Sequence, residues 1–74
     1  MTLPEYMRKV RRAMEMSQQQ LAEKLGVSYT SINRWEKKVV EPSPLARKSF
    51  LDFCKAQDIP IPPEILEDSE KALY

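Results

Sequence analysis

Apolar and polar residues alternate with the period of an α-helix along most of the chain. Within residues 3–15 the apolar positions lie three or four residues apart, which predicts a first helix with this stripe buried in the core. Thr2 and Glu5 stand at the spacing of a capping box before it, and Pro4 is tolerated in a first turn. The stripe consists of Leu3, Tyr6, Met7, Val10 and Met14.

Two shorter helices joined by a tight turn are predicted next, over residues 18–25 and 28–36. Ser17 caps the first of them, with Gln20 at capping-box distance. Gly26 is the only glycine, and it can take the left-handed conformation that ends a helix. Ser28 then caps the second helix. Its apolar residues Ile32 and Trp35 point one way, whereas Thr30, Asn33, Arg34 and Lys37 point the other way, with Tyr29 at the edge.

A fourth helix is predicted over residues 44–57, after a loop that Pro42 and Pro44 keep from being helical. Ser43 caps it, and Leu45, Phe50, Phe53 and Cys54 supply its apolar contacts, while Leu51 falls off the tightest version of this face. Residues 59–63 read as extended because residues before proline avoid the helical region. Residues 64–74 form either a short fifth helix or an acidic tail. The pattern predicts an all-α fold of four to five helices.

Charge divides the chain into a basic part and an acidic part. Residues 1–48 hold ten Lys or Arg and five Asp or Glu, whereas residues 49–74 hold two Lys and six Asp or Glu. This distribution suits a polyanion on the basic side, or it is only an uneven solvated surface. No run approaches the roughly 18 apolar residues of a membrane span, so we expect no membrane association.

The composition argues against an enzyme. The chain has no histidine, a single cysteine and a single glycine. It therefore offers no histidine acid–base pair, no zinc cluster and no glycine loop for phosphate. We expect no catalytic residue, no metal and no cofactor. Cys54 has no internal disulfide partner, which fits a reducing cytoplasm.

Residues 18–35 resemble the helix-turn-helix of the phage repressor and Cro family, also called the XRE family. That family has apolar residues at the positions of Leu21, Leu25, Val27, Ile32 and Trp35, a small residue at that of Ala22, and a turn glycine at that of Gly26. The resemblance covers roughly residues 5–60. It implies a compact lambda-repressor-like domain over residues 1–60, whose third helix lies in the DNA major groove. Residues 61–74 remain as a short helix or tail that could serve dimerisation.

The resemblance implies that the helix over residues 28–36 reads the bases. Arg34 can bond guanine O6 and N7 together, and Asn33 can pair with adenine in the same two-point way. Thr30 can place its methyl group against thymine or its hydroxyl on a base or a phosphate, and Tyr29 can do either from the edge. The structural alternative for all four is a polar, solvated helix face.

Phosphate contacts are expected around this helix. Gln18 opens the second helix, where free N–H groups favour an anion, and the family uses a glutamine here on the DNA backbone. Ser28, Lys37 and Lys38 are further candidates, although capping alone explains Ser28. The resemblance also implies a structural ion pair between Glu36 and Arg11, which would tie the first helix to the end of the third.

These features predict sequence-specific binding of double-stranded DNA by a transcriptional regulator, most simply a repressor. Family members usually dimerise on palindromic sites, so we expect a homodimer on DNA. The apolar residues that could form its interface, unless the domain's own core uses them, are Leu51, Ile59, Ile61, Ile65, Leu73 and Tyr74. The alternative is an antitoxin or another protein-binding module with the same fold, whose acidic C-terminal half would be the partner surface.

Overall fold

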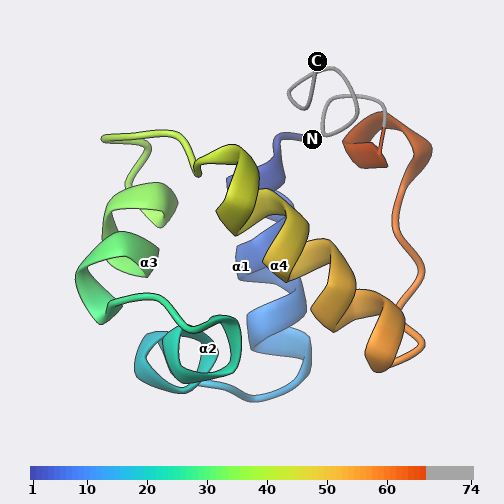
Figure 1. The fold of residues 1–74 in the computed structure, drawn as a ribbon, viewed down its shortest axis with the longest axis horizontal. Coiled ribbons are helices and arrows are strands. Elements are labelled where there is room, and N and C mark those ends of the chain that lie inside the picture. The colour runs from blue at the N-terminus through green and yellow to red at the C-terminus, as the bar shows by residue number, and fades with distance from the viewer. Residues whose placement is uncertain (67–74) are drawn as a thin grey trace.

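The computed structural model describes residues 1–66. Four helices follow one another along the chain: α1 (Leu3–Ala13), α2 (Gln18–Leu25), α3 (Tyr29–Glu36) and α4 (Pro44–Ala56). A single helical turn at residues 63–66 ends the described part. Figure 1 shows α4 crossing in front of α1, with α2 and α3 to one side. The predicted all-α fold is confirmed.

Each of the helices α1 to α4 begins after a hydroxyl residue. Thr2, Ser17, Ser28 and Ser43 each accept a hydrogen bond from the backbone N–H three residues later, as predicted from the sequence. In α1 and α2 the third helical residue also accepts from the cap's own N–H, which completes a capping box. The helix starts are therefore determined by local chemistry.

Every helix also ends in the same way, at a residue in the left-handed conformation. These residues are Glu15 (φ 56°), Gly26 (φ 68°), Lys38 (φ 60°) and Asp58 (φ 55°). The N–H of the next residue then bonds to the carbonyl five positions earlier, which is the Schellman arrangement. Only the turn at Gly26 was predicted, because glycine alone adopts this conformation without cost. The first and fourth helices consequently end at Ala13 and Ala56, slightly earlier than residues 15 and 57.

One core lies between the helices. Its largest fully buried side chains are Phe50, Leu21, Ile32, Ile65 and Cys54. Tyr6 meets the ring of Phe50 edge to face, with ring centroids 6.0 Å apart.

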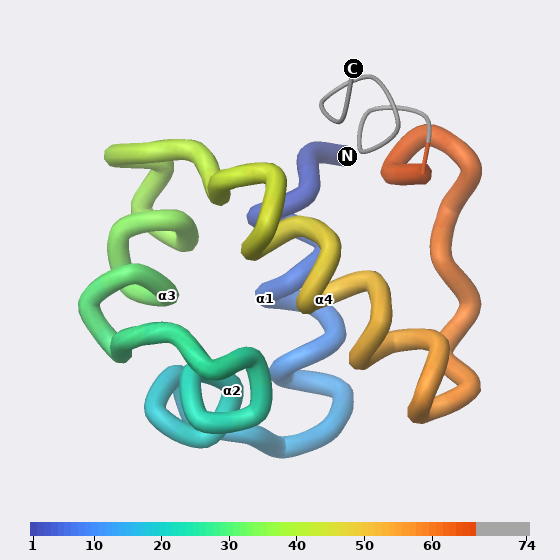
Figure 2. The backbone as a smooth tube through the Cα atoms, viewed as in Figure 1, coloured from blue at the N-terminus to red at the C-terminus, as the bar shows by residue number. Residues whose placement is uncertain are grey.

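The chain after α4 returns along the domain toward its N-terminal end (Figure 2). The buried Tyr6 hydroxyl donates to the carbonyl of Pro60, which holds this extended segment against the core. The amino group of Met1 also lies 3.6 Å from the Glu64 carboxylate. Ile65 therefore belongs to the same core as the helices, although it lies beyond the predicted boundary at residue 60.

Three predictions about the apolar stripes are wrong. Met14 is exposed, because it caps the end of α1 after the last helical turn. Leu45 is 75% exposed, since it lies on the side of α4 opposite the stripe formed by Ala46, Phe50 and Cys54. Leu51, predicted to fall off the tightest version of this face, is buried. The segment after α4 contributes Ile65 to the core, and Ile59 and Ile61 pack against it.

This packing also bears on the residues considered for a dimer interface. Leu51 and Ile65 are buried in the domain's own core, and Ile59 and Ile61 pack against it. Leu73 and Tyr74 lie outside the described residues, as does most of the predicted fifth helix or acidic tail. Large apolar side chains that are exposed include instead Val39 and Val40, between α3 and α4, and Leu45 in the first turn of α4.

Candidate nucleic-acid interface

Helix α3 has one buried face and one open polar face. Ile32 and Trp35 are buried in the core. Tyr29 is 48% exposed, and Thr30 and Arg34 are exposed on the same side of the helix. Thr30 and Arg34 are four residues apart, so they lie above one another on this face, whereas Tyr29 lies at its edge.

The turn between α2 and α3 gives this surface its orientation. Gly26 ends α2 in the left-handed conformation, and nothing lies within 4 Å of the position that a Cβ atom would take. The requirement for glycine is therefore conformational rather than steric. Ala22, buried on α2, is small enough for the two helices to pack closely.

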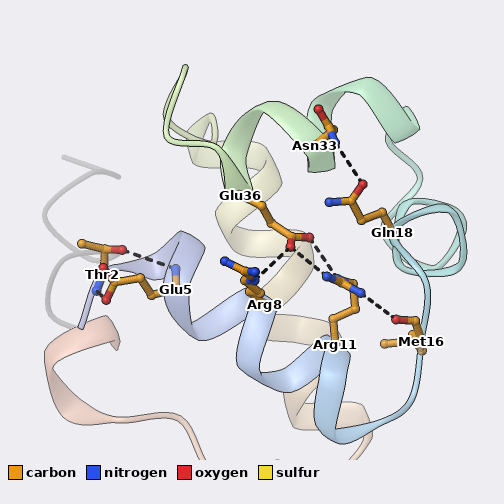
Figure 3. Close-up of polar contacts among 8 residues, drawn as sticks. All are labelled: Thr2, Glu5, Arg8, Arg11, Met16, Gln18, Asn33 and Glu36. Carbon is orange, nitrogen blue, oxygen red and sulfur yellow. Dashed lines mark hydrogen bonds and ion pairs between the residues drawn. The ribbon is translucent and has the colours of Figure 1, made fainter.

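A hydrogen bond joins the middle of α3 to the start of α2. The Nδ2 group of Asn33 donates to Oε1 of Gln18 at 3.1 Å (Figure 3). Both side chains are partly buried. The structure thus brings a predicted base reader and a predicted phosphate ligand into direct contact, which the spacing along the chain did not suggest.

Glu36, the last residue of α3, is held by α1. Arg11 donates from Nε to Oε2 at 2.9 Å and from Nη2 to Oε1 at 2.8 Å, a two-point pair. Its Nη1 donates to the carbonyl of Met16 at 3.0 Å. The two charged side chains are only 14% and 8% exposed. The structure therefore brings together the two residues that the resemblance paired.

Arg8 is a second partner of the Glu36 carboxylate, with its Nε 3.7 Å from Oε1 (Figure 3). The sequence analysis did not predict Arg8 as a partner of Glu36. The available signal is its position three residues before Arg11, which places both arginines on the same side of α1.

The other predicted phosphate ligands differ in whether their side chains already make a hydrogen bond. Lys37 is exposed directly after α3. Lys38 donates to Glu5 at 3.1 Å, and this hydrogen bond is the main reason that the pKa of Glu5 lies below its ordinary value. Ser28 accepts from the N–H of Ser31 at 3.1 Å, so its hydroxyl is engaged in capping.

Other functional chemistry is sparse in the described part of the chain. Residues 1–66 contain no group of three His, Cys, Asp or Glu side chains that could hold a metal. Burial raises the pKa of the Cys54 thiol from 9.0 to about 11, so this thiol stays protonated near neutral pH. Within the same residues, no helix has the length and hydropathy needed to cross a membrane.

Comparison with known proteins agrees with this geometry. A family model described as helix-turn-helix matches residues 7–46, which is more than half of the chain and includes all of α2 and α3. Curated proteins and solved structures give no match. The chain therefore belongs to the helix-turn-helix family of the phage repressor and Cro type, a family of DNA-binding transcription regulators.

Proposed function

We propose that this chain is a sequence-specific regulator that reads double-stranded DNA by laying α3 in the major groove. The exposed polar face of α3 is the observation that carries the proposal. It presents Thr30 and Arg34 one turn apart with Tyr29 exposed at its edge, while the opposite face is anchored in the core through Ile32 and Trp35. The major groove of B-DNA admits an α-helix, and its base edges offer the acceptors and methyl groups that these side chains contact.

Arg34 supplies the main discrimination in this proposal, through a two-point contact with guanine. Thr30 and Tyr29 contact neighbouring bases. Lys37 and Lys38, which follow α3, contact phosphates, with Lys38 exchanging its exposed ion pair with Glu5 for the DNA backbone. Ser28, at the N-terminal end of α3, adds a further contact to a phosphate.

We also propose that two copies bind together on a palindromic site, because one such helix reads only a few base pairs. Val39, Val40 and Leu45 form the contact between the copies. They are apolar and exposed, with Val39 and Val40 in the loop after the reading helix and Leu45 in the first turn of α4. Occupation of a promoter by such a pair blocks transcription, so the simplest regulatory outcome is repression.

The test is a selection from a random pool of double-stranded DNA, followed by titration of the selected site. The Arg34→Ala variant is compared with the wild-type chain at two salt concentrations. Lys55→Ala is the matched control, since it also removes one positive charge but from the end of α4 distant from α3 (Figure 1).

The proposal predicts enrichment of a palindrome whose half-sites lie about one helical turn apart. Arg34→Ala should lose preference at one base pair of each half-site, by a factor that corresponds to roughly 1–3 kcal/mol. Lys55→Ala should keep the full preference. Enrichment of single half-sites would refute the paired arrangement, and no enrichment would refute sequence-specific reading.

A further inference from the structure

We propose that Asn33 is a positioning residue, which acts on DNA through Gln18 by turning the amide of Gln18 toward a phosphate. This inference rests on the proposed function, because it assigns a mechanism to the same interface. Its basis is the hydrogen bond from Asn33 Nδ2 to Gln18 Oε1, 3.1 Å long and partly buried.

The three consecutive glutamines of α2 have three different environments. Gln20 completes the capping box, where its Oε1 accepts from the N–H of Ser17 at 2.8 Å. Gln19 donates along α2 to Glu23 at 3.3 Å. Gln18 alone bonds to α3. The structure therefore separates one glutamine from its neighbours by its contact with the reading helix.

This bond determines which end of the Gln18 amide is available. A glutamine side chain has an accepting oxygen and a donating NH2 group. The oxygen is occupied by Asn33, and Figure 3 shows the NH2 group turned away from that contact. Phosphate oxygens accept hydrogen bonds, so the group left available is the one that a phosphate requires.

The position of Gln18 adds a second donor at the same place. Gln18 is the first residue of α2, and the first backbone N–H groups of a helix have no partner within it. A phosphate there accepts from the backbone and the side chain together. Because Asn33 lies in the middle of α3, its bond couples the phosphate contact to the placement of the reading helix.

The experiment is a double-mutant cycle on DNA affinity with Gln18→Ala, Asn33→Ala and the double variant. Each protein is titrated against the selected site, against variants of that site with one base pair changed, and against an unrelated duplex. Thermal melting of each variant checks that the fold is intact. Arg34→Ala, alone and combined with Gln18→Ala, is the matched control for a base reader.

We expect Gln18→Ala to weaken binding roughly ten- to a hundredfold, which corresponds to the loss of a hydrogen bond to a charged group. Asn33→Ala should weaken it roughly two- to tenfold, because an unrestrained side chain must be ordered on binding. The loss should be equal for the selected site and its single-base variants. The double variant should bind no more weakly than Gln18→Ala alone, whereas Arg34→Ala should add its full effect to that of Gln18→Ala.

Two results would overturn the role of Asn33: losses that multiply in the double variant, or a loss confined to one base pair. The second would make Asn33 a direct base reader. A wild-type chain that binds the selected and unrelated duplexes equally would refute the proposed function instead. In that case the double-mutant cycle on the unrelated duplex still tests whether Asn33 acts through Gln18. A chain that binds neither duplex would refute both the proposed function and the role of Asn33.

Discussion

Replacing Arg11 with alanine should destabilise the domain more than any other single change on its charged surface. The substitution removes two hydrogen bonds to Glu36 and one to the Met16 carbonyl. It leaves a carboxylate that is only 8% exposed with Arg8 at 3.7 Å as its sole nearby cation among the described residues. Hydrogen bonds to charged groups contribute about 1.5–3 kcal/mol, and breaking a fully buried ion pair costs about 3–5 kcal/mol.

Because Arg8 can move closer to Glu36 and the Arg11–Glu36 pair retains some exposure, we expect Arg11→Ala to lower the free energy of unfolding by about 2–4 kcal/mol. A 74-residue domain has a total stability of roughly 4–11 kcal/mol, so this is a large share. At roughly 4–8 °C per kcal/mol for a domain of this size, the melting temperature should fall by about 10–25 °C. Urea denaturation followed by circular dichroism at 25 °C gives the free energy directly.

Three further variants separate the possible causes. Arg8→Ala removes a positive charge from the same side of α1 but should cost less than about 1 kcal/mol, since its pair is longer and half exposed. Arg11→Lys keeps the positive charge but cannot make the two-point hydrogen bond of the guanidinium, so its loss of stability should lie between those of Arg8→Ala and Arg11→Ala. A double-mutant cycle of Arg11→Ala with Glu36→Ala should give a coupling of about 1.5–3 kcal/mol. Equal losses for Arg11→Ala and Arg8→Ala, or a coupling near zero, would refute the reasoning.

Four further predictions concern turns, the core, the buried thiol and the contact between copies. Gly26→Ala should lose about 1 kcal/mol through backbone strain alone, and Glu15→Gly should gain about 0.5–1 kcal/mol by relieving the same strain, both measured by urea denaturation. Trp35→Ala should cost about 3–5 kcal/mol and unfold much of the population, so a well-folded variant that has only lost DNA binding would contradict its core role. Because burial raises the pKa of Cys54, the unfolded thiol ionises from about pH 9 while the folded one stays protonated until about pH 11, so the stability should fall across this window. Relative to Cys54→Ala, the wild-type chain should lose roughly 3 kcal/mol of unfolding free energy between these two pH values, as urea denaturation would show. Val40→Lys should abolish paired binding on a palindrome yet leave half-site affinity unchanged or higher, as gel-shift titration on full and half sites would show.

The parts of the fold that follow from the sequence are those determined by neighbouring residues. A cap and its target N–H lie three residues apart, so Thr2, Ser17, Ser28 and Ser43 could all be assigned from spacing alone. The stripes of α2 and α3 were also predictable, because short helices with two or three apolar residues have only one way to face a core.

The parts that were missed depend on contacts between elements. Glu15 and Lys38 adopt left-handed conformations that their residue types disfavour, and Asp58 adopts one that aspartate takes only occasionally. Each of these turns is closed by a backbone hydrogen bond from the following residue to the carbonyl five positions earlier. Leu51 is buried in a core to which the segment after α4 also contributes Ile65. The bond between Asn33 and Gln18 joins residues 15 positions apart, and no local pattern encodes the crossing of α2 and α3 that brings them together.

Helix α3 combines a small apolar anchor with polar contacts to α1 and α2, and under the proposed function this arrangement determines how its base preference can change. Only Ile32 and Trp35 of its eight residues are buried. Asn33 ties it to α2, and Glu36 ties its end to α1. None of these four residues is among the exposed side chains Tyr29, Thr30 and Arg34. Substitutions at the exposed positions should therefore alter which bases are preferred with little effect on stability, since surface changes usually stay within about 0.5 kcal/mol. The anchor and the polar contacts would keep the helix in place while its sequence preference changed.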